Sequence, residues 1–402
     1  MNAVVLGNGS SGRAAAELLR RDGAAVTVLD GADVWPDGRA FDLCVTSPGI
    51  PLDHPWQRRA RADGVSVVSE LQLGAARWRA RGGRMLAVTG SKGKSSVVKL
   101  VADALGGIPC GNYGRPLCDV ALESFDAANL PWAVVEVSSF QMETTVLPPD
   151  AFVAAAVLNL QEDHLDRHGG VAVYHGLKRA LLGMARTGIR GDCLPADAAD
   201  GECALLRGSY FDNPVLRTNG RCAVRLLRAA GLDDAAIAAA FARFEPLPHR
   251  MQTVGVFGGV AYVDDSKATS LAALDAGVAM AAARGAGTAG ARVRLIAGGL
   301  PKGDDPNSVI PRLRSEVKKV YLIGRCADQL LQAWEKAVPC EICGTLDRAV
   351  AAARRDALSG EVVLLSPGAA SFDQFKSYGV RGDAFRSLVC AGAGCVAEDA
   401  SK

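Results

Sequence analysis

Short apolar runs alternate with segments in which apolar residues recur every three or four positions along most of the chain. The runs predict buried strands, and the periodic segments predict amphipathic helices. The predicted strands cover residues 3–6, 25–30, 43–47, 66–68, 85–88, 132–137, 152–158, 260–263, 293–297, 320–323 and 362–365. The predicted helices include residues 13–21, 71–81, 235–244, 270–282 and 346–358. Strands that alternate with helices are typical of parallel sheets, so the predicted fold class is α/β.

We expect the chain to form three domains. A chain of 402 residues exceeds what one ordinary hydrophobic core organises. The regular alternation weakens between residues 182 and 219, and the prolines within residues 245–248 end the middle part of the pattern. The predicted domains are a Rossmann-like unit at residues 1–77, a P-loop ATPase-type unit at residues 78–247 and a second Rossmann-like unit at residues 248–402.

Composition and charge narrow the class of protein. Apolar residues make up 49% and charged residues 22% of the chain, which excludes a disordered protein. The formal net charge is only +2, from 45 basic and 43 acidic residues, and without a Lys/Arg-rich block we expect no nucleic-acid partner. The chain enters a strand at its first residues and has no apolar run long enough to span a membrane, so we expect a cytoplasmic protein with no membrane partner. The eleven cysteines lack framework spacing, and we expect free thiols rather than a zinc site.

The segment at residues 85–100, MLAVTGSKGKSSVVKL, places a glycine-rich turn between a predicted strand and a predicted helix. Such a turn points backbone N–H groups at one place, where the helix dipole adds positive charge. Lys94 can reach the β- and γ-phosphates of a nucleotide, and the Ser95 hydroxyl can bind Mg²⁺. The loop is shorter than the common P-loop pattern, and the alternative is a surface turn without function. The context favours nucleotide binding at Gly90, Ser91, Lys92, Gly93, Lys94, Ser95 and Ser96.

The first turn of the chain carries a second nucleotide signature. Gly7, Gly9 and Gly12 fit the GxGxxG pattern after a strand, and Asp30 closes the next strand. This is the dinucleotide fingerprint, and alone it leaves three interpretations about equally open: an NAD-dependent dehydrogenase, another diphosphate ligand, or a tight turn that needs three glycines. The rest of the chain carries residues suited to phosphoryl transfer, which favours a diphosphate ligand other than NAD.

Charged residues gather at the ends of two further predicted strands. Glu136 ends an apolar strand, where a carboxylate beside a P-loop is well placed to hold Mg²⁺; the alternative is a salt-bridged acid. The segment at residues 158–168, LNLQEDHLDRH, concentrates carboxylates and histidines, including His164, after another strand. Lys178 follows on a predicted amphipathic helix, and from the residues alone we interpret it as a solvated lysine.

Taken together, these motifs resemble the Mur ligase family. The resemblance rests on TGSKGKSS, EVSSFQ, LNLQEDHLDRH with Lys178, HRM at 249–251, DDSKATS at 264–270, GGLPK at 298–302 and SPGAASFDQFKSYGVRGDAF at 366–385, which occur in family order over almost the whole chain. The GGLPK and final segments look like the glutamate-adding branch. The resemblance implies an ATP-dependent ligase of peptidoglycan precursor synthesis that joins glutamate to UDP-N-acetylmuramoyl-L-alanine through an acyl phosphate. It also implies two Mg²⁺ sites, a carbamylated lysine and a monomer.

The resemblance assigns expected roles residue by residue. The catalytic residues would be Lys94, Glu136, His164, Lys178 and Lys267. ATP would be bound by the P-loop residues together with Asn219, Arg250 and Asp265. The UDP substrate would be bound by Gly7, Asn8, Gly9, Ser10, Ser11, Asp30, Ser47, Pro48, Gly49, Asn112, Ser138 and His164.

Two further sets follow from the same resemblance. Glutamate would be bound by Thr269, Lys302, Ser371, Phe372 and Tyr378. The metals would be held by Ser95, Glu136, His164 and Lys178, the last as a carbamate.

The chain departs from the family in its central part. The stretch between Lys178 and Asn219 is shorter than expected, so the P-loop domain is predicted to be shortened. Thr218 and Asn219 stand where the family has a His-Asn-x-x-Asn run that contacts adenine. Two alternatives therefore stay open beside a D-glutamate ligase: a relative that adds L-glutamate, and a non-catalytic nucleotide-binding homologue. A dehydrogenase is the third.

Overall fold

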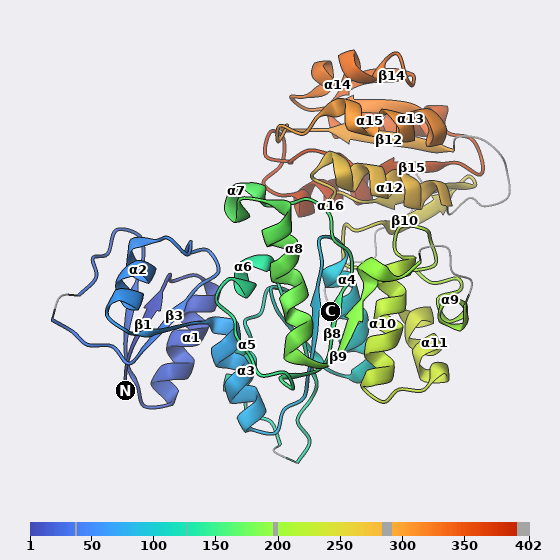
Figure 1. The fold of residues 1–402 in the computed structure, drawn as a ribbon. Helices are drawn as coiled ribbons and strands as arrows, with labels where there is room; N and C mark the ends of the chain where they lie inside the picture. The colour runs from blue at the N-terminus through green and yellow to red at the C-terminus, as the bar shows by residue number, and fades with distance from the viewer. Residues whose placement is uncertain (37, 127, 196–199, 284–291, 392–402) are drawn as a thin grey trace. The chain divides into compact units, whose positions relative to one another are not determined.

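The computed structural model describes residues 1–36, 38–126, 128–195, 200–283 and 292–391 (Figure 1). The stretch 284–291, which is expected to be a loop, lies outside the described residues. By their contacts the residues form two compact units, one of Met1–Asp212 with Leu216–Phe244 and the other of Asn213–Val215 with Glu245–Lys402. The first unit contains two sheets and the second contains one.

The first sheet is parallel and four-stranded, in the order β2-β1-β3-β4. Its strands are β1 (Asn2–Leu6), β2 (Ala25–Leu29), β3 (Leu43–Thr46) and β4 (Ser66–Ser69), and its helices are α1 (Ser10–Arg21) and α2 (Pro55–Ala62). Leu6 pairs with both Leu29 and Thr46, so these three strands end level. The residues that follow β1, β2 and β3 therefore meet at one edge of the sheet.

The second sheet is parallel and five-stranded, in the order β6-β7-β5-β8-β9. Its strands are β5 (Met85–Thr89), β6 (Ile108–Gly111), β7 (Ala133–Glu136), β8 (Phe152–Val157) and β9 (Ala185–Arg190). Strand β5 is central and entirely buried. Strands of a parallel sheet are covered on both faces, which explains why its sequence is apolar almost throughout. The glycine-rich turn directly follows β5. Because β7 and β8 pair with β5 on either side, the segments after these two strands flank that turn.

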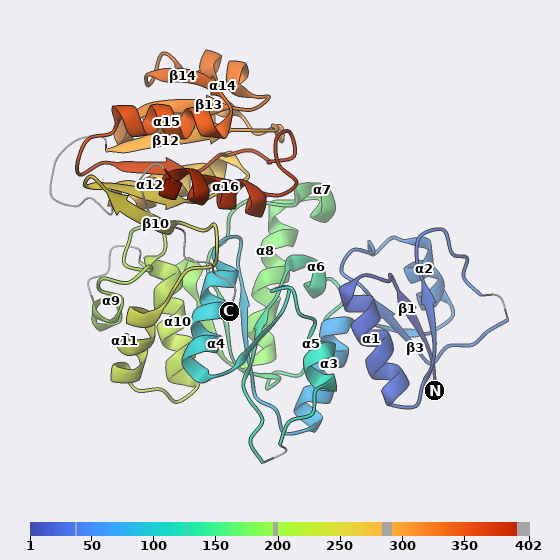
Figure 2. The ribbon, with the colours of Figure 1, turned by 180° about the vertical axis from the view of Figure 1, so that it is seen from behind.

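Besides the short 3₁₀ turn η2 (Gly191–Cys193), ten helical segments follow β4 in the described part of this unit. They are α3 (Glu70–Ala80), α4 (Lys94–Leu105), α5 (Leu117–Leu122), α6 (Ser139–Met142), α7 (Leu165–His168), α8 (Val171–Ala180), the 3₁₀ turn η1 (Leu181–Met184), α9 (Gly201–Leu205), α10 (Arg217–Ala229) and α11 (Asp234–Arg243). Helices α10 and α11 contact α4, while α6 and α7 contact α8. Helices α3 and α5 lie side by side, as the views of Figures 1 and 2 both show.

A buried carboxyl joins α3 to α5. Glu70 is the first residue of α3 and is 1% exposed. Its Oε1 accepts a hydrogen bond from the Cys118 backbone N–H at 2.7 Å, whereas Oε2 has no hydrogen-bond partner in the described part of the chain. Burial, the main cause, raises the pKa of Glu70 to about 7.

The third sheet, in the second unit, is six-stranded in the order β10-β11-β15-β12-β13-β14. Its strands are β10 (Gln252–Phe257), β11 (Val260–Asp264), β12 (Val293–Gly298), β13 (Val317–Ile323), β14 (Cys340–Gly344) and β15 (Val362–Leu365). Only β10 is antiparallel to its neighbour. The helices are α12 (Leu271–Ala283), α13 (Ile310–Glu316), α14 (Ala327–Trp334), α15 (Leu346–Asp356) and α16 (Tyr378–Ala391).

The structure confirms the α/β class and every strand that the hydrophobic pattern predicts. The strands that the pattern misses are β6, β9, β10 and β14, and all of them are edge strands. The irregular structure expected before Asn219 is wrong in part, because that stretch contains β9 and the start of α10. The expected turn at residues 7–12 is also too long, since α1 already begins at Ser10.

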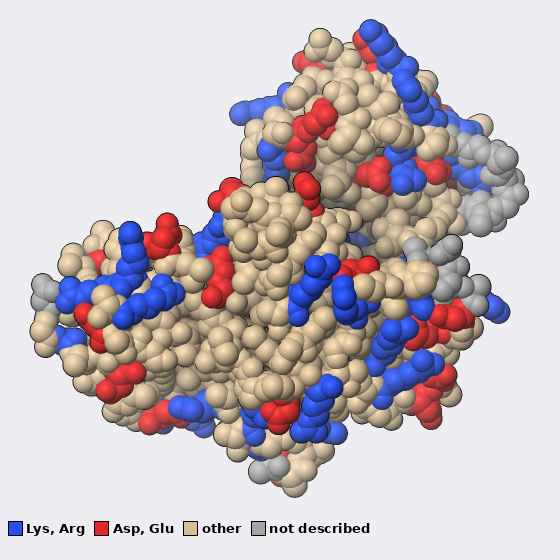
Figure 3. Space-filling model, in the orientation of Figure 1, with Lys and Arg blue, Asp and Glu red and all other residues tan. Residues whose placement is uncertain are grey.

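Basic and acidic side chains are interspersed over the face shown in Figure 3. The ten cysteines within the described ranges form no disulfide. No helix in those ranges has both the length and the apolar character needed to cross a membrane.

Candidate functional site

The glycine-rich turn after β5 is shaped by two glycines with positive φ. Gly90 has φ +152°, and Gly93, the N-cap of α4, has φ +81°. Residues other than glycine rarely adopt such positive φ values. A Cβ on Gly93 would also lie 2.1 Å from Nδ2 of Asn219. The Lys94 ammonium folds back over the turn and donates to the carbonyl oxygens of Gly90, at 2.9 Å, and Ser91, at 3.3 Å.

A second lysine reaches the same carbonyl from α8. Lys178 is 1% exposed, and its Nζ donates to the Gly90 oxygen at 3.0 Å and lies 4.5 Å from the centre of the Tyr174 ring. Burial, with a smaller contribution from the charge of Lys94, lowers the pKa of Lys178 to about 7. The interpretation of Lys178 as a solvated lysine is therefore wrong, because it is a buried amine at the glycine-rich turn.

Glu136 ends β7, beside the turn, because Val88 of β5 pairs with it. It is 3% exposed, and its Oε1 accepts from Nδ2 of Asn112 at 2.8 Å. Its Oε2 is buried and has no hydrogen-bond partner in the described residues. A buried carboxylate oxygen without a donor suits a hard cation such as Mg²⁺.

The predicted metal ligands are of mixed type. Within the ranges that the structure describes, no three His, Cys, Asp or Glu side chains form a group that could hold a metal by themselves. Glu136 and His164 are the only members of the predicted set with such side chains. A cation at Glu136 would therefore need further ligands from a hydroxyl such as Ser95, from phosphate, or from a modified lysine.

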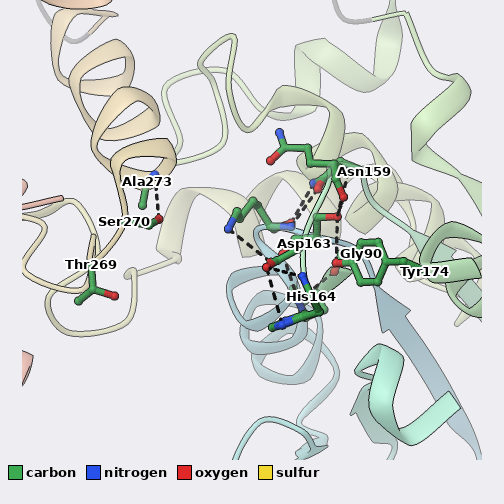
Figure 4. A network of polar contacts seen from close by, with 12 residues as sticks. Gly90, Asn159, Asp163, His164, Tyr174, Thr269, Ser270 and Ala273 are labelled. Atoms are coloured by element: carbon green, nitrogen blue, oxygen red, sulfur yellow. Dashed lines mark hydrogen bonds and ion pairs between the residues drawn. The ribbon is translucent and has the colours of Figure 1, made fainter. Parts of the chain in front are cut away.

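The segment after β8 closes over the turn and includes a residue that the sequence analysis missed (Figure 4). Asn159 accepts from the Lys92 backbone N–H at 2.9 Å and donates to the Lys92 carbonyl, also at 2.9 Å. It also donates to Oδ1 of Asn219 at 3.0 Å, which places Asn219 against the turn. The Ser91 hydroxyl contacts Gln161 O, at 3.1 Å, and the Tyr174 hydroxyl, at 3.2 Å. An asparagine directly after an apolar strand was the available signal for Asn159.

His164 stands at the N-cap of α7 in the left-handed conformation, with φ +53°. Its side chain is 47% exposed, and its ring lies 4.9 Å from that of Phe140. Nδ1 of His164 lies 3.8 Å from Oδ1 of Asp163. The ring is thus held at the surface of the site rather than in the core.

The turn after β1, where the sequence predicts a diphosphate site, is a tight turn that leads into a helix N-terminus. Its backbone is tied to the next strand, since the Asn8 N–H donates to Oδ1 of Asp30 at 3.2 Å. A Cβ on Gly12 would lie 1.8 Å from the Gly7 oxygen, so the close approach needs glycine. The Ser47 hydroxyl donates to the Gly7 oxygen at 3.5 Å, which brings the loop after β3 onto the turn. Gly9 is the N-cap of α1, so the N-terminus of this helix, with Ser10 and Ser11, faces the same place.

Two predicted substrate residues have structural partners. Asn112 is bound to Glu136 through its side chain, and its N–H donates to the Glu136 carbonyl at 2.8 Å. Ser138 forms a capping box with Gln141 at the start of α6. Both lie at the carboxyl ends of β6 and β7, next to the predicted metal site.

In the second unit, the segment at residues 249–267 forms a polar cluster. Asp265 is 8% exposed and accepts from the Met251 N–H at 3.2 Å and the Ser366 hydroxyl at 2.9 Å. Burial raises the pKa of Asp265 to about 7. His249 and Met251 both have positive φ, +60° and +50°, and Arg250 between them is half-buried.

The predicted glutamate residues come together in part. Lys302 donates to the Thr269 hydroxyl at 3.1 Å, and Lys267 lies 3.9 Å from the centre of the Tyr378 ring. A cavity of about 210 Å³ beside Lys302 is lined by Leu271, Pro301, Lys302, Gly303, Asp304, Pro306, Cys326, Gln329, Leu330, Gly368 and Ala369. Ser371 is buried, whereas Phe372 is 70% exposed, and neither lines this cavity.

Comparisons with known proteins identify the family of this chain. Residues 88–189 match the Mur ligase middle domain, and residues 249–368 match the glutamate ligase domain of Mur ligases. A UDP-N-acetylmuramoylalanine–D-glutamate ligase of Acidobacterium capsulatum is 34% identical over 98% of this chain and 97% of its own length. One of Frankia casuarinae is 35% identical over 96% and 93%, respectively.

Solved structures share the fold at low identity. The UDP-N-acetylmuramate–alanine ligase MurC of Thermotoga maritima has a TM-score of 0.55 and 15% identity, over 98% of this chain and all of that one. The MurF ligase of the same organism, solved with ADP, has a TM-score of 0.56 and 14% identity, over 88% and 96%.

Proposed function

The chain belongs to the Mur ligase family, and we propose that it is an ATP-dependent ligase that adds D-glutamate to UDP-N-acetylmuramoyl-L-alanine in peptidoglycan precursor synthesis. The observation that carries the proposal is the convergence of Lys94 and Lys178 on the Gly90 carbonyl, beside the strand that ends in Glu136. Two amines at a glycine-rich turn, with a buried carboxylate next to them, suit the transfer of a phosphoryl group.

The proposed reaction has two steps. A carboxylate oxygen of the UDP substrate attacks the γ-phosphorus of ATP, which gives an acyl phosphate and releases ADP. The glutamate nitrogen then attacks the acyl carbon, inorganic phosphate leaves, an amide remains and the nitrogen loses a proton. Lys94 would balance charge on the transferring phosphoryl group, since catalysis of this kind is mainly positioning and electrostatics.

Mg²⁺ in two sites would neutralise the phosphate oxygens when bound. The residues proposed to hold it are Ser95, Glu136, His164 and Lys178. The unpartnered Oε2 of Glu136 supports this assignment, because a cation would satisfy that buried oxygen.

We further propose that Lys178 is carbamylated. A neutral amine and CO₂ form a carbamate with release of a proton, and the carbamate supplies an anionic oxygen ligand. The pKa of about 7 supports this, because the buried amine is then largely neutral at physiological pH.

The remaining assignments follow the family order. Asn219, Arg250 and Asp265 would contact ATP, and Lys267 the acyl phosphate. Glutamate would bind at Thr269, Lys302, Ser371, Phe372 and Tyr378, a set supported by the Lys302–Thr269 contact and by the adjoining cavity. The proposed domains are residues 1–77 for the UDP substrate, 78–247 for ATP and 248–402 for glutamate, acting as a monomer.

Amide exchange at the turn after β1 distinguishes a uridine diphosphate ligand from a nicotinamide cofactor. Bound UDP-N-acetylmuramoyl-L-alanine should slow amide exchange at residues 7–12, because a diphosphate there gains N–H contacts and the dipole of α1. NADH should not slow it. Protection by NADH alone would favour a dehydrogenase.

Phosphate release tests the whole proposal. With ATP, Mg²⁺ and UDP-N-acetylmuramoyl-L-alanine, D-glutamate should release phosphate and L-glutamate should not. Release with L-glutamate alone would assign a different amino-acid substrate, and no release with either would reject the ligase.

A further inference from the structure

Arg167 links the first sheet to the second through a loop of the proposed UDP site. It lies on α7, three positions after His164. Its Nη2 donates to the carbonyl oxygens of Pro48, at 3.3 Å, and Ile50, at 3.2 Å. These two carbonyls flank Gly49 in the loop that follows β3, and both contacts lie within one compact unit.

The same guanidinium also binds a carboxylate, through its Nε and through the Nη2 that contacts the loop. Nε of Arg167 donates to Oε1 of Glu143 at 3.1 Å, and Nη2 donates to Oε2 at 2.7 Å. The Glu143 side chain is 6% exposed and that of Arg167 is 17% exposed. The guanidinium also lies 5.1 Å from the Phe140 ring. A bidentate, mostly buried pair of this kind fixes geometry in a way that exposed ion pairs do not.

Glu143 is itself anchored to the end of β7. Nδ1 of His168 lies 3.2 Å from Oε1 of Glu143, and Nε2 of His168 lies 3.0 Å from the Ser139 hydroxyl. Burial lowers the pKa of His168, so a neutral ring that donates from Nδ1 and accepts at Nε2 satisfies both contacts. The connected groups therefore run from the start of α6, three residues after Glu136, to the loop at residues 47–50.

We propose that Arg167 is a positioning residue that fixes the loop at residues 47–50 relative to His164 and Glu136, so that a substrate gripped by its UDP end presents its carboxylate at the phosphoryl site. The inference rests on the proposed function. The loop also touches the turn after β1 through Ser47. One guanidinium thus connects the two places that a UDP-linked carboxylate substrate must span.

The test is steady-state kinetics of Arg167→Ala. The KM for UDP-N-acetylmuramoyl-L-alanine should rise roughly tenfold, as expected for lost hydrogen bonds to a charged group, while the ATP KM changes less than twofold. Arg79→Ala is the matched control, because Arg79 also pairs with a carboxylate, Asp150 at 2.9 Å, away from this loop. Equal shifts in both KM values, or no shift in either, would overturn the proposal.

Conservative variants separate positioning from folding. Arg167→Lys keeps a donor for the loop carbonyls but loses the bidentate pair, so its substrate KM should fall between those of the wild type and Arg167→Ala at unchanged melting temperature. Glu143→Gln should shift the same KM in the same direction, and an unchanged KM in both folded variants would reject the role. If the wild type itself releases no phosphate, the proposed function fails, whereas an active wild type with unaffected variants removes only the role of Arg167.

Discussion

Replacing Lys178 with alanine removes a buried amine that contacts the glycine-rich turn after β5. At pH 7.5 an amine with a pKa of about 7 is about three-quarters neutral, whereas one with the ordinary value of about 10.4 is roughly 0.1% neutral. The neutral form that reacts with CO₂ is therefore several hundred times more abundant at this position. If the carbamate helps to hold the metal, Lys178→Ala should lower kcat by roughly 10² or more, as the loss of one preorganised group does.

The assay is phosphate release by wild type and Lys178→Ala in ordinary and CO₂-depleted buffer. Wild-type activity should fall on depletion and return with bicarbonate, and the variant should not respond to either. Acetate should restore part of the variant's activity by supplying the missing carboxylate oxygen. Arg179→Ala, one position further on α8 and paired with Asp192, is the control for helix damage. Near-normal turnover of Lys178→Ala without an additive would refute the reasoning.

Three further substitutions test other parts of the structure. Lys94→Met removes the ammonium over the turn and should lower kcat by roughly 10² or more; normal turnover would contradict the phosphate role. Lys302→Ala should raise the glutamate KM strongly and leave the ATP KM unchanged, because Lys302 would touch only the amino acid; equal shifts would remove it from the glutamate pocket. Glu70 has a folded-state pKa raised from 4.5 to about 7, so the folded protein holds the extra proton between these values and loses stability as pH rises through them. Denaturant titrations from pH 4.5 to 8 should show a smaller loss in Glu70→Gln, and an equal loss would place the effect elsewhere.

The strands show what the sequence can and cannot predict about this fold. Interior strands such as β5 are buried on both faces and read as apolar runs. Four of the six edge strands in the described residues were missed, and their burial is weak: β9 has one buried residue among six, and β10 has none. A pattern of local periodicity therefore captures the central strands of all three sheets and misses the edge strands of the two larger ones.

The candidate site also contains residues that the sequence locates and residues that it does not. The glycine-rich turn and Glu136 could be located from the sequence because a strand end is a local feature. The burial of Lys178 could not, because it depends on how α8 meets the Gly90 carbonyl. The same holds for Arg167, whose partners at residues 48 and 50 are more than a hundred positions away. Three-dimensional contacts, rather than residue types, distinguish these two basic side chains from solvated ones.

His164, His249 and Met251 are the non-glycine residues with positive φ in the described ranges. The left-handed conformation costs such residues about 1–2 kcal/mol each, and all three occur in segments proposed to bind substrates. Glycine at any of the three would relieve the strain, while glycine at His164 or His249 would also delete an imidazole. An engineering campaign that selects only for heat resistance would thus be drawn to these positions and would damage the proposed substrate sites there. Thermostability and turnover should be improved at different places in this enzyme.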